Sequence, residues 1–378
     1  MAEQEERAEG ASFSYEERNE ERWTVDGAFT YRPCFPFLYK TERTRFNGSW
    51  VGRLVITPVF VVLGPLVAAF RLLAFVLLQS LVTLCSYVIT WGYPEDEPLR
   101  GWRILVAKIV SYPLYFLMLT AWGVILVPDL RRRAKRPRIC VSNHVSILDI
   151  FLMILCEGPA FVSKRGVSRV PLMGKAMEIL RVMYVREGEK GEKESGGGGA
   201  TALFERRLAA MRRDPGWRPI HIFPEGTTTT EQAVLRFHTS VFRLGEEVQP
   251  ICIRYVSYNP VAYVGQDLRT VVYRYLTNPF VLAFVTYLDP VSPFDAENGG
   301  ALKEPRAFAD EVGQAIAREL GATYLPYSNE DAFFFRGLKT DANRCTPEFQ
   351  RDYGWLGTLQ TTFEERRRAE EAEKSKKD

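Results

Sequence analysis

Two short segments of the chain combine residue types that can carry out acid–base chemistry. In SNHVSILDI, His144 precedes Asp149 by five residues, directly after an apolar run that predicts a β-strand. An imidazole beside a carboxylate is the minimum requirement for general base catalysis, because the carboxylate fixes the ring tautomer and stabilises the imidazolium. The spacing suits this role if His144 lies in the turn before a helix and Asp149 points back toward it.

The second segment is PIHIFPEGTTTT, in which an apolar strand runs into Pro224, Glu225, Gly226 and Thr227. Such a turn delivers a carboxylate and several hydroxyls to a sheet edge, where α/β domains build their sites. By itself this composition is more typical of an ordinary strand-to-turn junction. The His-Asp spacing alone also arises easily by chance, so each segment needs the other as context.

Histidine and cysteine usage limits the other chemistries. The chain has three histidines, and beside His144 we expect His221 within a strand and His238 at the surface or in packing. The six cysteines are scattered without a CxxC pair or a Cys/His set, so they are interpreted as reduced packing residues and no metal site is predicted. A hydrolase is disfavoured because the sequence contains no GxSxG nucleophile elbow.

Two long apolar stretches precede these segments. The first runs from Leu54 to Gly92, interrupted by Arg71, and the second runs from Ile104 to Val127. A straight crossing needs only about 20 residues, so the first stretch must be broken, tilted or partly interfacial. Basic residues flank the outer ends and the acidic PEDEP lies between, so the positive-inside rule predicts a hairpin with both outer flanks in the cytosol. The alternative is a pair of buried or interfacial helices on a monotopic protein.

After Arg131 short strands alternate with amphipathic helices, which predicts an α/β fold with a mixed sheet flanked by helices and preceded by N-terminal membrane helices. We expect a polar N-terminal tail over 1–49, membrane-associated helices over 50–130, a catalytic domain over 131–335 and a charged C-terminal extension over 336–378. Strands are predicted at 138–143, 159–164, 182–185, 219–223, 250–255 and 281–288, and helices at 147–156, 201–213 and 306–320.

Charge patterning leaves several interpretations open. The net charge of +3 is small, and no nucleic-acid partner is expected. The basic run RRRAKRPR (131–138) could attract anionic lipid headgroups or CoA phosphates, or could simply flank a membrane segment. Segment 187–199 is interpreted as a flexible glycine-rich loop and not as a phosphate-binding loop. Lys374 and Lys376 match a dilysine retrieval signal of the endoplasmic reticulum or a chance pattern.

Taken together, the two chemical segments resemble signature blocks of the glycerolipid acyltransferase superfamily. NHVSILD (143–149) and FPEGT (223–227) are similar to its first and third blocks, RVMYVRE (181–187) to its second and VQPICIRY (248–255) to its fourth. These blocks follow one another in the order of the superfamily. The resemblance covers roughly residues 50–335.

Two longer stretches indicate a branch of the superfamily. Residues 223–255 and GQAIARELGATYLPYSNED (313–331) resemble the lysophosphatidylcholine and lysophosphatidylethanolamine acyltransferases more than the lysophosphatidate acyltransferases. The resemblance implies an acyl-CoA-dependent O-acyltransferase of the endoplasmic reticulum membrane that re-acylates such lysophospholipids, with its catalytic domain in the cytosol. Two alternatives stay open: acylation of glycerol-3-phosphate or lysophosphatidate in de novo phospholipid synthesis, and a catalytically inactive membrane lipid-binding scaffold.

The same resemblance implies roles for individual residues. His144 would be the general base and Asp149 its orienter, while Arg186 would contact the phosphate of the acceptor. In the superfamily one residue separates the Tyr-Val pair from this arginine, whereas Arg186 follows Val185 directly, so Arg181 stays open as a substitute. The membrane phospholipid, the lysophospholipid and acyl-CoA are the expected partners, with acyl-CoA as co-substrate and no cofactor. The remaining residues implied to bind substrate are Glu225, Gly226, Thr227 and Arg254.

Overall fold

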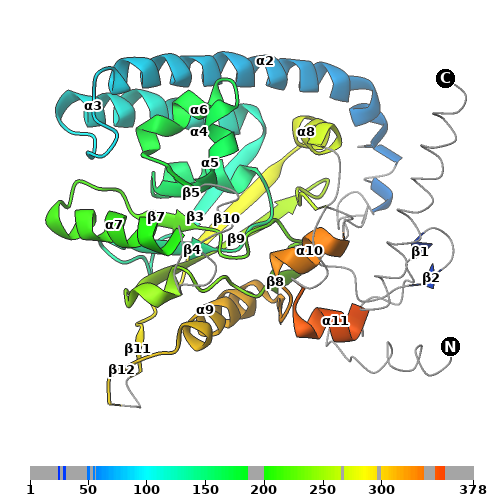
Figure 1. Ribbon diagram of the computed structural model, residues 1–378. Coiled ribbons are helices and arrows are strands. Elements are labelled where there is room, and N and C mark those ends of the chain that lie inside the picture. Colours follow the sequence, from blue (N-terminus) through cyan, green and yellow to red (C-terminus); the bar gives the residue numbers. More distant parts are fainter. Residues whose placement is uncertain are drawn as a thin grey trace, which may run out of the picture.

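Seven strands form one mixed sheet at the centre of the molecule, in the order β3-β10-β9-β4-β7-β5-β6 (Figure 1). Neighbouring strands run parallel except for β9 and β10, which pair antiparallel. The computed structural model describes residues 24–25, 29–30, 49–51, 54–55, 57–185, 200–264, 268–295, 299–335 and 345–353. The strands of the sheet are β3 (Val124–Asp129), β4 (Ile139–Ser142), β5 (Ala160–Lys164), β6 (Met183–Val185), β7 (Ile220–Ile222), β9 (Val248–Ser257) and β10 (Val281–Tyr287).

Helices cover both faces of this sheet (Figure 1). β4 is buried along its length, and its side chains point alternately into two hydrophobic cores. Ile139 and Val141 pack with α7 (Ala200–Arg213) and α9 (Pro305–Leu320), whereas Cys140 packs with α4 (Tyr112–Ala121) and α5 (Leu148–Cys156). Continuous apolar character is expected of a parallel strand that is covered on both faces. The helices are α4 (Tyr112–Ala121), α5 (Leu148–Cys156), α6 (Met173–Ala176), α7 (Ala200–Arg213), α8 (Leu268–Thr277), α9 (Pro305–Leu320), α10 (Asn329–Phe335) and α11 (Pro347–Tyr353).

The six predicted strands and three predicted helices all occur, with ends shifted by one or two residues in most cases. The predicted domain boundary at residue 131 is wrong. β3 pairs with β10 from Val124 to Asp129, so the sheet begins inside the second apolar stretch. An edge strand and a membrane helix are both apolar, and periodicity alone does not separate them over so few residues.

The first apolar stretch forms α2 (Thr57–Thr90), a helix of 34 residues that is about 51 Å long and lies across the top of the molecule in Figure 1. Its polar side chains anchor it to the α/β domain along its length. Arg71 Nη1 donates hydrogen bonds to the carbonyl oxygens of Leu276 and Asn278, at 2.9 and 2.6 Å. Near the other end, Thr83 Oγ1 donates to the Leu172 carbonyl at 2.8 Å.

The opposite face of α2 is apolar and open. Val62, Leu66 and Phe70 expose 71%, 70% and 66% of their surface. The arrangement is the reverse of a water-soluble helix, because the polar residues point inward and the apolar residues point outward. An exposed apolar surface of this extent is typical of a site that binds a membrane or another protein, and the length and composition of the helix favour a membrane. The exposed side chains recur every three or four residues: Val62, Leu66, Phe70, Leu73, Leu77, Leu81, Leu84 and Val88.

The second apolar helix runs through α3 (Gly101–Val106), η3 (Ala107–Ser111) and α4, and it packs beside α2. By length and composition, Val61–Thr90 and Gly101–Ala121 could each cross a membrane. α2 is attached to the α/β domain from Arg71 to Thr83 and beyond, so one side of this stretch contacts protein. This attachment favours the monotopic alternative, in which both helices lie against the domain, but the crossing hairpin stays a prediction as well.

Replacing Arg71 with methionine tests this attachment. Arg71→Met leaves the carbonyl groups of Leu276 and Asn278 without their donor, so we expect the free energy of unfolding to fall by about 1–3 kcal/mol. Thermal unfolding and limited proteolysis in detergent measure the effect. Leu73→Met, on the exposed face, is the control and should leave both unchanged. A wild-type melting temperature and proteolysis pattern for Arg71→Met would show that Arg71 does not hold α2 in place.

Candidate active site

The segments that contain His144 and Glu225 come together at one edge of the sheet. β4 and β7 are adjacent parallel strands, and the chain leaves each of them at the same end. His144 follows β4 and Glu225 follows β7, so the topology brings together two segments that are 81 residues apart. The carboxyl ends of parallel strands are where open α/β sheets bind their ligands.

Asn143 controls how the chain leaves β4. Its side-chain amide continues the ladder between β4 and β9: Nδ2 donates to the Ile253 carbonyl at 2.9 Å, and Oδ1 accepts from the Ile253 N–H at 2.8 Å. A side chain thus takes the place of the backbone in the last pair of the ladder. The backbone of His144 is thereby released from the sheet and can turn toward α5.

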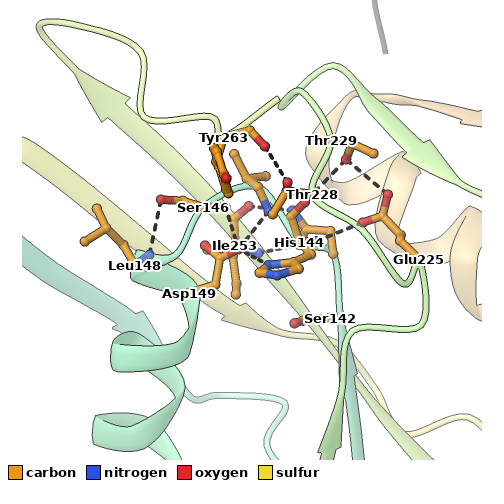
Figure 2. A network of polar contacts seen from close by, with 12 residues as sticks. Ser142, His144, Ser146, Leu148, Asp149, Glu225, Thr228, Thr229, Ile253 and Tyr263 are labelled. Atoms are coloured by element: carbon orange, nitrogen blue, oxygen red, sulfur yellow. Dashed lines mark hydrogen bonds and ion pairs between the residues drawn. The ribbon is translucent and has the colours of Figure 1, made fainter. Parts of the chain in front are cut away.

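Asp149 lies in the first turn of α5 and points back toward His144 (Figure 2). Its Oδ2 atom is 2.8 Å from His144 Nδ1 and accepts hydrogen bonds from the backbone N–H groups of Val145 and Ser146, at 2.7 and 2.9 Å. The Tyr255 hydroxyl donates to Oδ1. Burial raises the pKa of Tyr255, so this hydroxyl keeps its proton. Asp149 is fully buried, yet both of its oxygens are matched with donors.

The His144 ring lies at the surface end of this network. If the Asp149 carboxylate accepts the hydrogen bond from the ring, Nδ1 carries the proton, and this tautomer of a neutral imidazole has its lone pair on Nε2. The ring stacks on Phe223 at a centroid distance of 4.0 Å, and 18% of the side chain is exposed. This arrangement orients one basic nitrogen toward the outside, as a general base requires.

The Glu225 carboxylate is fully buried and points toward His144 and Thr229 (Figure 2). Oε1 accepts the His144 N–H at 2.8 Å, and Oε2 accepts the Leu235 N–H at 2.9 Å and lies 3.1 Å from Thr229 Oγ1. Burial raises the pKa of Glu225 to about 8, while these donors oppose the rise. The sequence predicts an acceptor-binding role for Glu225, whereas in the structure its contacts fix the backbone of His144 and the turn that follows.

The residues after Glu225 form a tight turn. Gly226 has a φ of +70°, and a Cβ atom at this position would lie 3.0 Å from both His238 Nε2 and Asn329 Nδ2. Glycine is therefore required both by the backbone conformation and by the close approach of two side chains. Thr227, the next residue, is buried.

The three arginines considered for substrate binding have different positions. Arg186 lies outside the described residues. Arg254 is exposed on β9 next to Phe284, on the opposite face of the strand from Tyr255. Arg181 precedes β6, at the end of the sheet away from His144, so it does not take the place of Arg186 at this site.

The basic run at 131–138 is largely neutralised. Arg131 pairs with Asp129, and Arg133 donates two hydrogen bonds to Glu157, at 2.6 and 2.9 Å. The run connects β3 to the start of β4, so it lies at the end of the sheet opposite His144. In the part of the chain that the structure describes, no cluster of three His, Cys, Asp or Glu side chains could hold a metal ion.

Sequence reasoning missed three members of the site: Asn143, Phe223 and Tyr255. Asn143 and Phe223 stand within the motifs and directly beside the chemical residues, which is the signal that could have identified them. Tyr255 lies 106 residues from its partner Asp149, and its position in the fourth block gives no indication of that contact. Only the pairing of β9 with β4 brings it there.

Substitution of Glu225 tests its positioning role. Glu225→Ala leaves the buried N–H groups of His144 and Leu235 without acceptors, so we expect a loss of about 2–5 kcal/mol in the free energy of unfolding. Hydrogen exchange at the same two amides should accelerate. Glu225→Gln keeps one acceptor oxygen and should lose less. Unchanged exchange at both amides in Glu225→Ala would contradict this role.

The raised pKa of Glu225 also predicts how the free energy of unfolding changes with pH. Its pKa rises from an ordinary value of 4.5 to about 8 on folding, so folding favours the protonated form. The corresponding stability is fully present below about pH 4.5 and is lost as the pH rises to about 8. Unfolding curves between these values should therefore show the wild type losing stability relative to Glu225→Gln. A constant difference over this range would contradict the raised pKa.

Comparisons with known proteins agree with this geometry. A family model described as Acyltransferase matches residues 125–263, which include both chemical segments. A lysophosphatidylcholine acyltransferase of Drosophila melanogaster is 23% identical over 328 residues, covering 85% of this chain and 58% of its own length. The lysophospholipid acyltransferase LPCAT4 of Homo sapiens is 26% identical over 271 residues, covering 69% of this chain and 50% of its own length.

Among solved structures, the 1-acyl-sn-glycerophosphate (LPA) acyltransferase PlsC from Thermotoga maritima is 18% identical with a TM-score of 0.40, covering 66% of this chain and 96% of its own. The chain spans about half the length of the curated relatives it matches. Residues 125–263 of the chain thus match the Acyltransferase family, and the chain is similar to lysophospholipid acyltransferases over most of its length.

Proposed function

We propose that this protein is a membrane-attached acyl-CoA-dependent O-acyltransferase that re-acylates lysophosphatidylcholine or lysophosphatidylethanolamine. The observation that carries the proposal is the 2.8 Å contact between His144 Nδ1 and Asp149 Oδ2, which leaves Nε2 as a base near the surface. The names of the curated relatives support a lysophospholipid as the acceptor. Acyl-CoA is the donor whose thioester supplies its own leaving group, so the reaction requires no further cofactor.

The reaction proceeds by direct transfer. His144 Nε2 removes the proton from a glycerol hydroxyl of the lysophospholipid, and the resulting alkoxide oxygen attacks the thioester carbonyl carbon. The tetrahedral intermediate collapses as the carbon–sulfur bond breaks and the new ester forms. The imidazolium then returns its proton to the sulfur, so CoA leaves as a thiol and His144 is neutral again.

Asp149 lowers the barrier through His144. When the ring becomes positively charged, the carboxylate 2.8 Å away stabilises it, and the bond to Nδ1 keeps Nε2 directed at the substrate. The donors from Val145, Ser146 and Tyr255 hydrogen-bond the Asp149 carboxylate and hold it in its buried position. Asp149 and Tyr255 are therefore positioning residues, and His144 is the residue that touches the reacting atoms.

The outer face of α2 supports membrane attachment on one side of the domain. Its exposed apolar stripe, which includes Val62, Leu66 and Phe70, would enter the lipid while the α/β domain stays at the surface. The lysophospholipid acceptor and the long-chain donor would both reach the site from that surface. We propose the endoplasmic reticulum membrane with a cytosolic catalytic domain; the supporting lysines, Lys374 and Lys376, lie outside the described residues.

Replacement of the base tests the catalytic role. His144→Ala should lower kcat by about 10²- to 10⁴-fold, because general base catalysis contributes about that much. Asp149→Asn should give a comparable loss, since an amide no longer stabilises the imidazolium. Transfer of labelled acyl groups by purified protein in lipid nanodiscs measures both, with thermal unfolding as the control for folding. Wild-type transfer by His144→Ala would overturn the catalytic proposal.

A matrix of acceptors against acyl-CoA donors tests the substrate class. Lysophosphatidylcholine, lysophosphatidylethanolamine, lysophosphatidate and glycerol-3-phosphate are each assayed with the same donors. We expect kcat/KM for at least one of the first two to exceed that of the last two by about tenfold or more, which corresponds to about 1.4 kcal/mol. Faster acylation of lysophosphatidate or glycerol-3-phosphate would assign the protein to de novo synthesis instead.

A further inference from the structure

Both the backbone conformation and the burial of Arg181 are energetically unfavourable. It adopts a left-handed backbone conformation, with φ 54° and ψ 45°, directly before β6, and only 6% of its surface is exposed. Non-glycine residues adopt this conformation infrequently, and a buried guanidinium normally requires hydrogen-bonding partners. Within the described residues, Nε and Nη2 of Arg181 have none. Among the described residues, no hydrogen bond to Nε or Nη2 of Arg181 compensates for this conformation and this burial.

A second arginine lies beside it. Arg207 of α7 donates a hydrogen bond from Nη2 to the Arg181 carbonyl oxygen at 3.2 Å. Arg207 Nη1 and the hydroxyl of Tyr184 on β6 are also buried without a partner in the part of the chain that is described. Burial and the charge of Arg181 lower the pKa of Arg207 to about 10, and both groups stay charged at neutral pH. Two positively charged guanidinium groups thus lie close together between β6 and α7, and both have N–H groups without an acceptor among the described residues.

Aromatic rings fix the planes of both guanidinium groups. Arg181 lies over Tyr93 at 5.2 Å, and Arg207 lies over Trp217 at 4.1 Å. A guanidinium stacked on a ring presents its N–H groups at its edge, in the plane where a phosphate or carboxylate accepts them. The stacking therefore leaves the donors available and limits the directions in which they can point.

Within the described residues, nearby carboxylates do not satisfy these donors. Glu178 precedes Arg181 by three residues in the sequence, and it is engaged by Thr90 Oγ1 at 3.0 Å and by Lys175. Glu95 and Glu97 are exposed, and they act on Arg181 through longer-range electrostatics. Among the residues that the structure describes, no ion pair joins Arg181 or Arg207 to an acidic side chain, so an external anion fits the remaining donors.

We propose that Arg181, Arg207 and Tyr184 form a binding site for a phosphoryl group, separate from the site at His144. A phosphate oxygen accepts in-plane hydrogen bonds from a guanidinium edge, and two guanidinium groups together compensate the charge of a phosphate monoester. The tyrosine hydroxyl supplies one further donor. Binding would satisfy the orphaned groups and remove the repulsion between the two arginines.

The position of this site limits the source of the phosphoryl group. In the register of β4, β7, β5 and β6, Arg181 is level with Ile139, which precedes His144 by five residues. Arg181 is also separated from His144 by three strand-to-strand spacings. The two Cα atoms are therefore on the order of 20 Å apart. The phosphate of a lysophospholipid is only a few bonds from its free hydroxyl, so an acceptor at His144 does not reach Arg181. The remaining sources are the nucleotide end of CoA, which rests on the proposed function, and a separate anionic membrane lipid.

Ligand-induced thermal stabilisation of the full chain tests the site without relying on catalysis. The probes are CoA, inorganic phosphate, and nanodiscs of phosphatidylcholine with or without phosphatidic acid. We expect CoA or phosphatidic acid to raise the melting temperature, and Arg207→Met to weaken the apparent affinity roughly tenfold or more. A response to CoA identifies the nucleotide source, and a response to phosphatidic acid identifies the lipid source. His144→Ala should keep the response, which separates this site from catalysis.

Arg181→Gly provides a sharper variant. Glycine adopts the left-handed conformation freely, so the variant should be at least as stable as the wild type without ligand, yet lose the stabilisation by ligand. Arg206→Met, one residue before Arg207 and exposed on α7, is the control for lost charge. Leu172→Gly, at the other non-glycine position with positive φ, is the control for relieved strain among the described residues. Both controls should respond to ligand like the wild type. If no probe stabilises the wild type, or if Arg181→Gly and Arg207→Met respond fully, the site does not exist.

Discussion

Asp149 carries a carboxylate that is fully buried, and the structure around the site depends on supplying donors to it. The donors come from the ring of His144, from two backbone N–H groups and from the Tyr255 hydroxyl. These groups belong to the loop after β4 and to β9. A carboxylate that lacked them would take up a proton or move toward water. The strand order and the first turn of α5 are both constrained by this one charge.

Glu225 is a second buried carboxylate with a different function in the fold. Asp149 contacts the ring of His144, whereas Glu225 contacts its backbone, and together they fix one residue from two sides. The environments differ as well, since Asp149 is hydrogen-bonded to a histidine ring, whereas burial raises the pKa of Glu225 to about 8. Asp149 and Glu225 thus have different roles in one site because their surroundings differ.

The apolar helix α2 also satisfies its polar side chains through contacts with the domain. α2 turns its polar residues toward the domain and its apolar residues outward, so its inner face binds the domain and its outer face is suited to lipid. Arg71 illustrates the principle: a charge within an apolar stretch is satisfied by the carbonyl groups at the end of α8.

The sequence by itself determined the α/β class, the strands from 138 onward, the two chemical segments and the apolar character of the N-terminal third. These features follow from local periodicity and from short motifs, which a single chain carries on its own. Only the tertiary structure decided that Glu225 faces inward, that Tyr255 completes the Asp149 network, that β3 joins the sheet and that Arg181 and Arg207 lie together. Those facts depend on strand order and on packing between residues far apart in the chain, and no local pattern records which distant partner a side chain will meet.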